Sequence, residues 1–112
     1  MQARYRLRDR RDFDQMRQQG RSFARPTLVL SIRPNGLGHN RYGVVVGKRL
    51  GTAVIRNRVR RRLREAMRQL HPQLLPGYDI VVIARPALVD ICFEDLRDTL
   101  QAVLCQAKLK VE

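Results

Sequence analysis

The segment from residue 55 to residue 70 constrains the fold of this chain more than any other. Its apolar residues recur at helical spacing and form one stripe, which predicts an amphipathic helix. The stripe consists of Ile55, Val59, Leu63, Ala66, Met67 and Leu70. Seven arginines and one acid, Glu65, lie between residues 56 and 68. One side of this helix must therefore pack on a core, while the other side carries a dense positive charge.

That charge is unfavourable for an isolated helix. Arginines four residues apart, such as Arg56 and Arg60 or Arg60 and Arg64, each destabilise a helix by about 0.2–0.5 kcal/mol. Lys48 and Arg49 also crowd the expected N-terminus, where the helix dipole is already positive. An arrangement that is unfavourable in the free protein indicates a polyanionic partner.

The composition narrows the kind of polyanion. The chain has 23 Lys and Arg against 10 Asp and Glu, and 19 of the basic but only 4 of the acidic residues lie in residues 1–68. Twenty of the basic residues are arginine, whose planar fork binds phosphate through two hydrogen bonds and stacks on bases. This favours nucleic acid, with a membrane surface or an acidic protein as the alternatives.

The length of 112 residues predicts a single domain over residues 1–112 with one core. The arginine-rich start does not resemble a signal peptide, and no segment approaches the about 20 apolar residues of a membrane span. We therefore expect a cytoplasmic protein without a membrane partner. Cys92 and Cys105 fit neither a zinc pattern nor a disulfide framework, and we expect reduced, partly buried thiols.

Hydrophobic periodicity predicts the remaining elements: a helix at 9–18, an extended piece at 21–24, strands at 27–32, 42–47 and 79–84, and a helix at 93–108. The runs at 42–47 and 79–84 are apolar toward both faces, which is typical of interior strands. The arginine helix between them predicts a β-α-β unit with parallel strands. The turn-forming residues at 33–40 predict a hairpin loop.

The turn at residues 47–52 is the clearest candidate phosphate contact outside the helix. Its glycines and basic side chains precede a helix N-terminus, where backbone N–H groups attract anions, and Thr52 can cap the helix. Asn57 is a candidate for contacts to a base edge or a ribose hydroxyl, with helix capping or simple solvation as the alternative.

The sequence shows no chemistry for catalysis by the protein. The acids Asp9, Asp12 and Asp14 are expected to balance nearby arginines rather than to hold metal ions. His39 and His71 are expected in a loop and at a helix end, and they do not form a pair for general acid–base chemistry. We therefore predict neither catalytic residues nor metal ligands.

The run from Arg41 to Ala66 closely resembles the protein subunit of bacterial ribonuclease P. The shared core is Gly-Lys-Arg-Leu-Gly-x-Ala-Val-x-Arg-Asn-Arg at residues 47–58. The likeness extends to Arg6-Leu7, Asp12-Phe13 and Gly20, to residues 78–85, and to Phe93-Glu-Asp-Leu, so it covers nearly the whole chain.

The resemblance implies a fold in more detail. That fold is an α+β, α-βββ-α-β-α two-layer sandwich with a four-stranded mixed sheet (ribosomal protein S5 domain 2-like). It also implies a left-handed βαβ crossover, whereas the general preference is for right-handed crossovers.

The same resemblance implies a function. In that family the catalyst is an RNA that uses magnesium ions to hydrolyse precursor tRNA and release the 5′ leader. The small basic protein binds the catalytic RNA and the leader. This chain is accordingly expected to be a non-catalytic subunit of an endoribonuclease, with no cofactor of its own and no obligate protein partner.

Site residues carry over position by position. The resemblance implies a leader-binding cleft between the first helix, the sheet and the basic helix, with candidates Phe13, Arg17, Ser31, Lys48, Arg56 and Asn57. Relatives often carry aromatic residues where this chain has Arg17 and Ser31, so Phe13 is the main candidate for base stacking, and Arg17 can stack or bind phosphate. Candidates for RNA binding on the basic helix and the preceding loop are Lys48, Arg49, Arg56, Asn57, Arg58, Arg60, Arg61, Arg62, Arg64 and Arg68.

Two other functions compete with this prediction. Composition allows a ribosome-associated or RNA-chaperone-type protein with a similar basic surface, and the motif at residues 47–58 is what discriminates against it. The second alternative is an autonomous metal-dependent nuclease, which the lack of a catalytic constellation disfavours.

Overall fold

The computed structural model describes residues 20–109. Its elements, in order, are β1 (Arg21–Ala24), β2 (Leu28–Pro34), β3 (Arg41–Val45), the 3-10 turn η2 (Lys48–Leu50), α2 (Ala53–Leu70), η3 (His71–Gln73), β4 (Tyr78–Ala84), η4 (Pro86–Leu88) and α3 (Phe93–Gln106). The extended piece predicted at 21–24 is confirmed as β1. The helix predicted at 9–18 lies outside the described residues.

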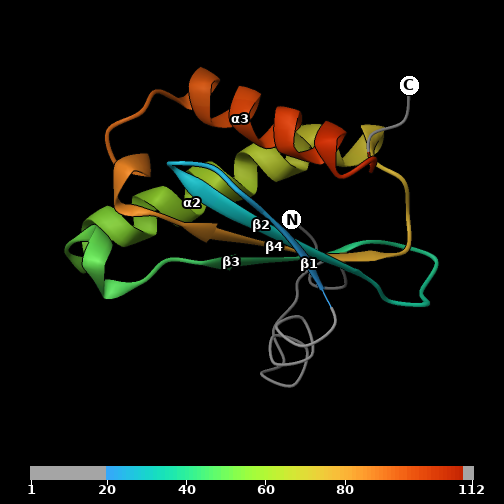
Figure 1. Ribbon diagram of the computed structural model, residues 1–112. Coiled ribbons are helices and arrows are strands. Elements are labelled where there is room, and N and C mark those ends of the chain that lie inside the picture. Colours follow the sequence, from blue (N-terminus) through green and yellow to red (C-terminus); the bar gives the residue numbers. More distant parts are fainter. Residues whose placement is uncertain (1–19, 110–112) are drawn as a thin grey trace.

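The four described strands form one mixed sheet in the order β1-β2-β4-β3 (Figure 1). β2 pairs antiparallel with β1 and β4, whereas β3 pairs parallel with β4. Because α2 connects β3 to β4, the predicted β-α-β unit is confirmed. β4 is interior, as predicted, with Ile80, Val81 and Val82 at most 2% exposed.

Two details of the predicted sheet are wrong. Residues 33–40 do not form a hairpin loop, because β4 lies between β2 and β3. β3 is not interior but lies at one edge of the described sheet, and Val45 at its end is 38% exposed. Turn-forming residues indicate that the chain reverses direction, but not how many strands separate the two arms. The doubly apolar β4 takes the central place, where both of its backbone edges are paired.

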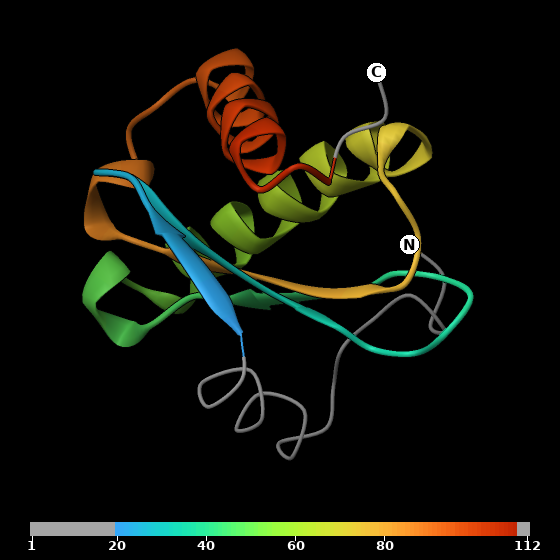
Figure 2. The ribbon, with the colours of Figure 1, turned by 45° about the vertical axis from the view of Figure 1, so that its right-hand side comes forward.

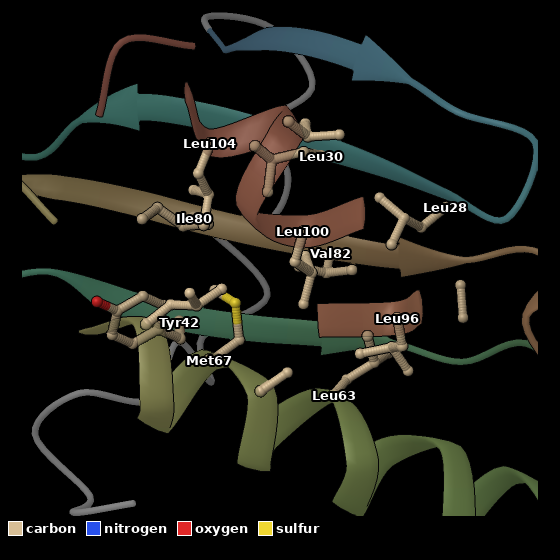
Figure 3. Packing of buried hydrophobic residues seen from close by; sticks show 14 of the residues in the cluster. Leu28, Leu30, Tyr42, Leu63, Met67, Ile80, Val82, Leu96, Leu100 and Leu104 are labelled. Carbon is tan, nitrogen blue, oxygen red and sulfur yellow. The ribbon is translucent and has the colours of Figure 1, made fainter. Parts of the chain in front are cut away.

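α2 and α3 cover the same face of the sheet, which gives the implied two-layer arrangement (Figures 1 and 2). The core lies between these layers (Figure 3). Alternate residues of β2 and β4 point into it, as the period of two of a β-strand requires. Side chains that are at most 1% exposed include Leu28, Leu30, Leu63, Met67, Ile80, Val82, Leu96, Leu100 and Leu104.

α2 begins abruptly after a tight turn. The Thr52 hydroxyl accepts a hydrogen bond from the Ile55 N–H at 3.3 Å, so the predicted N-cap is confirmed. Gly51 has φ of 136°, and a Cβ there would lie 3.0 Å from Ile55 Cδ1, so a larger residue would be strained. The turn places the exposed Lys48 and Arg49 directly before the helix.

α3 is shorter than the predicted range of 93–108. It ends at Gln106, because Lys108 adopts a left-handed φ of 62° and the chain turns back to bury Leu109. The N–H groups of Lys108 and Leu109 bond to the carbonyls of Cys105 and Leu104 at 3.0 and 3.1 Å, a common way to end a helix. Both cysteines are exposed, so the expectation of partly buried thiols is wrong.

Candidate nucleic-acid interface

α2 presents its arginines on two flanks of a buried stripe. The stripe is formed by Val59, Leu63, Ala66, Met67 and Leu70, as the sequence predicts except that Ile55 is only partly buried. We call Arg56, Asn57, Arg60 and Arg64 the sheet-side flank, because they follow one another at helical spacing on the side where Arg60 reaches Val46 after β3. We call Arg58, Arg61, Arg62 and Glu65 the α3-side flank. Arg68 is exposed further along the helix.

The sheet-side flank is partly organised by its own contacts. Arg60 Nη1 donates to Asn57 Oδ1 at 2.7 Å, and Arg60 Nη2 lies 3.5 Å from the Val46 carbonyl oxygen. The Asn57 side-chain amide nitrogen can still donate to a ligand. Arg56 Nε is buried and has no hydrogen-bond partner in the structure. The first turns of α2 therefore combine a positioned guanidinium, an amide donor and an unsatisfied N–H.

The start of α2 is electropositive for two reasons. Its first turn contains no acid, so the partial positive charge of the helix dipole is not balanced there. Lys48 and Arg49 of η2 are exposed just before it, while Leu50 is buried and anchors the turn. The phosphate contact predicted for residues 47–52 stays a prediction, for which this end of the helix supplies N–H groups and cations.

The α3-side flank contains the one acid of α2. Arg68 donates to both carboxylate oxygens of Glu65, and the Gln69 amide donates to Oε1 at 3.3 Å. These hydrogen bonds lower the pKa of Glu65 to about 2. Arg62 Nη2 donates to the Ile91 carbonyl at 2.7 Å and ties α2 to the segment that precedes α3. Glu65 thus stays ionised at neutral pH among a majority of cations.

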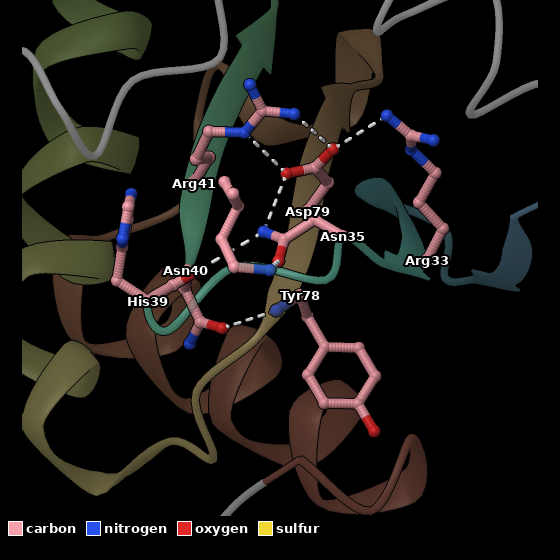
Figure 4. Close-up of polar contacts among 8 residues, drawn as sticks. Arg33, Asn35, His39, Asn40, Arg41, Tyr78 and Asp79 are labelled. Atoms are coloured by element: carbon pink, nitrogen blue, oxygen red, sulfur yellow. Dashed lines mark hydrogen bonds and ion pairs between the residues drawn. The ribbon is translucent and has the colours of Figure 1, made fainter.

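The second face of the sheet, which neither described helix covers, carries its own charged cluster (Figure 4). Arg33 of β2 and Arg41 of β3 flank Asp79 of β4 in register and bind its carboxylate at 2.9–3.0 Å. Burial raises the pKa of Asp79, but hydrogen bonds from Arg41 and Asn35 and the two arginine charges outweigh this and lower it. The Asp79 carboxylate is therefore held between two guanidinium groups, one from each neighbouring strand.

Ser31 lies on the same second face. Its side chain is 7% exposed, and its hydroxyl lies 3.0 Å from the hydroxyl of Ser22 on β1. The structure thus places the candidate leader-binding residues on the sheet (Ser31), in η2 (Lys48) and in the first turns of α2 (Arg56 and Asn57). Phe13 and Arg17 lie outside the described residues.

Sequence reasoning missed two groups of charged or aromatic residues. Arg33 and Arg41 both contact Asp79 only because β4 lies between their strands. Local sequence patterns do not predict this contact. Phe93 is the first residue of the helix predicted at 93–108, and it also lines a groove beside α2. Its position at the first residue of α3 was the available signal, since such residues lie at the edge of a helix interface.

His71, at the end of α2, is bound into the fold through Tyr42. His71 Nδ1 lies 2.5 Å from the Tyr42 hydroxyl, and burial lowers the pKa of His71. Within residues 20–109, His, Cys, Asp and Glu side chains do not gather in groups of three or more that could hold a metal ion. In the same range, no helix has both the length and the apolar character needed to cross a membrane.

The fold and the interface together define a small α+β protein with a strongly cationic helix beside a mixed sheet. Residues 1–108 match the family model described as Ribonuclease P. The ribonuclease P protein component of Roseiflexus castenholzii is 46% identical over 108 residues, covering 96% of this chain and 88% of that protein. That of Symbiobacterium thermophilum is 43% identical over 110 residues, covering 97% and 96%.

Solved structures agree. The RNase P protein of Staphylococcus aureus superposes with a TM-score of 0.87 at 34% identity, covering 95% of this chain and 97% of that chain. The RNase P protein of Thermotoga maritima gives 0.82 at 36% identity, covering 88% and 94%. Two β-α-β units with crossovers of opposite hand do not superpose. The crossover through α2 therefore has the same hand as in these structures, which is the left hand that the resemblance implies.

The chain therefore belongs to the ribonuclease P protein family. It is a subunit of the endoribonuclease ribonuclease P, it acts in tRNA processing, and its RNA partner is the ribonuclease P RNA. The ribosome-associated or RNA-chaperone alternative is not favoured.

Proposed function

We propose that this protein holds the single-stranded 5′ leader of precursor tRNA while α2 docks on the catalytic RNA. The observation that carries the proposal is the polar surface of α2, where seven arginines accompany a single acid. A helix that needed only solubility would mix its charges, since like charges at this spacing cost stability. A polyphosphate partner repays that cost, because each phosphate contact releases counterions.

The proposed division of labour follows the two sides of the fold. The leader lies along the second face of the sheet toward the start of α2, where Ser31, Lys48, Arg56 and Asn57 lie, with Phe13 and Arg17 added by resemblance. The remaining arginines, from Arg58 to Arg68, contact the catalytic RNA.

Catalysis in this proposal belongs to the RNA. Magnesium ions are bound and used by the RNA, and the protein holds no metal or other cofactor. Its role is to keep the substrate beside the RNA's reaction centre and to reduce repulsion between two polyanions. The protein is expected to act in the cytoplasm, without an obligate protein partner and without a membrane.

Reconstitution tests the proposal directly. Adding the protein to a cognate ribonuclease P RNA should speed leader removal from precursor tRNA, most strongly at low magnesium, where phosphate repulsion is least screened. The protein without RNA should not cleave the precursor. An unchanged rate with the RNA present, or cleavage by the protein in its absence, would contradict the proposal.

The salt dependence gives a second measurement. If the protein contacts about six leader phosphates, the logarithm of its binding constant for the leader should fall linearly with the logarithm of the salt concentration. The expected slope is about −4. A slope near zero is incompatible with electrostatic binding.

The leader itself is tested by Phe13→Ala. The variant should bind precursor tRNA about 5- to 140-fold more weakly, the range expected for loss of one base–aromatic stack. Mature tRNA has no leader and serves as the control. Equal losses for the two RNAs would argue against a leader-binding role.

A further inference from the structure

A groove lies between α2 and the beginning of α3. Its volume is about 280 Å³, and it is lined by Arg58, Arg61, Arg62, Glu65 and Phe93. The four α2 residues follow at spacings of three and four, so they share one side of the helix. Arg62 is bound to the Ile91 carbonyl and holds the two walls together, whereas Arg58 and Arg61 are exposed at the groove.

Glu65 gives this groove a chemistry that a plain phosphate site lacks. Its carboxylate is ionised, because the hydrogen bonds from Arg68 and Gln69 lower the pKa of Glu65 to about 2. Those residues donate three hydrogen bonds to it, whereas a carboxylate can accept about four. An ionised carboxylate repels a phosphate and accepts from an N–H group. The groove therefore suits a ligand with an N–H donor near Glu65 and an anion near Arg58 and Arg61.

Phe93 adds an aromatic surface. It is partly buried, so that one part packs on the core while another part lines the groove. Nucleobases stack on such side chains with little dependence on sequence. An unpaired nucleotide offers a planar base, a base N–H that no complementary strand occupies, and phosphates on both sides. These are the three features that the groove requires.

We propose that this groove receives one unpaired nucleotide of the ribonuclease P RNA. The base lies against Phe93 and donates an N–H to Glu65, and the flanking phosphates contact Arg58 and Arg61. This inference rests on the proposed docking of α2 on that RNA. It adds a defined nucleotide site on the α3-side flank, away from the sheet.

The nucleotide site is tested by whether removing Glu65 weakens or strengthens binding to ribonuclease P RNA. Glu65→Ala and the control Asp98→Ala, at an exposed acid of α3, each remove one negative charge. If the groove were only a cationic surface, both variants would bind ribonuclease P RNA equally or more tightly than wild type. We expect this for Asp98→Ala only. Glu65→Ala should bind about fivefold more weakly, because the base N–H loses its acceptor.

Phe93→Leu is the second variant, since it keeps an apolar side chain against the core. It should weaken RNA binding about five- to tenfold without changing the salt slope, because stacking rather than phosphate contact is lost. Phe23→Leu, at a partly buried aromatic residue of β1, is the control and should bind as wild type does. Thermal melting of all variants reports on folding.

These measurements distinguish an error in the nucleotide site from an error in the proposed function. If Glu65→Ala binds as tightly as Asp98→Ala, the nucleotide site is wrong, while docking of α2 can still be correct. If the wild-type protein does not bind ribonuclease P RNA, the proposed function fails, and the nucleotide site fails with it.

Discussion

α2 and α3 lie side by side on one sheet face, yet their polar surfaces differ in kind. Each contributes fully buried residues to the same core, such as Leu63 and Leu100. α3 has Glu94 and Asp95 in its first turn, where acids stabilise the helix dipole. α2 has no acid there, and Lys48 and Arg49 precede it. The apolar stripe of a helix thus decides where the helix packs, whereas unfavourable electrostatics on its other side indicate a partner.

Two substitutions test whether α2 and α3 anchor the core equally. Leu63→Ala and Leu100→Ala should each lower the free energy of unfolding by about 2–5 kcal/mol, because both side chains are 0% exposed and leave cavities. Chemical denaturation measures the two values. If only one variant were destabilised, the two helices would not be equal anchors of the core.

Two double variants test whether the charge on α2 differs in function from the charge on α3. The double variant Arg60→Glu with Arg64→Glu should weaken binding to ribonuclease P RNA about 100-fold or more, since two charge-assisted contacts are lost and replaced by repulsion. The control is Arg97→Glu with Lys108→Glu, which changes the net charge equally but on and just after α3. Similar losses for the two double variants would show that only total charge matters and that α2 is not the docking surface.

The smallest effect concerns the helix caps. Thr52→Ala should cost about 1 kcal/mol of stability, because an oxygen N-cap is lost. Cys92→Ala should cost only a few tenths, because the thiol at the start of α3 is a weak acceptor at 3.5 Å. Cys92→Ser should stabilise α3 slightly, as serine is a preferred cap. Urea titrations of the three variants measure the differences, and equal costs for the two alanine variants would contradict the capping geometry.

Local sequence patterns determined a large part of this protein. The 3.6-residue period of apolar residues identified α2 and α3, alternation identified β2, and Thr52 with Gly51 marked the start of α2. These signals succeed because each depends on neighbours within one or two turns of chain. The arginine density also predicts that α2 binds a polyanion, since charge at fixed helical spacing is a local property.

The order of the strands and the side-chain contacts across them depend on tertiary packing. β4 inserted between β2 and β3, made β3 an edge, and brought Arg33, Asp79 and Arg41 into one cluster. Phe93 lies beside the α3-side flank of α2 because α2 and α3 pack on the same face of the sheet. Such contacts join residues that are tens of positions apart and are selected by burial of the whole sheet, so no short stretch of sequence contains the information that specifies them.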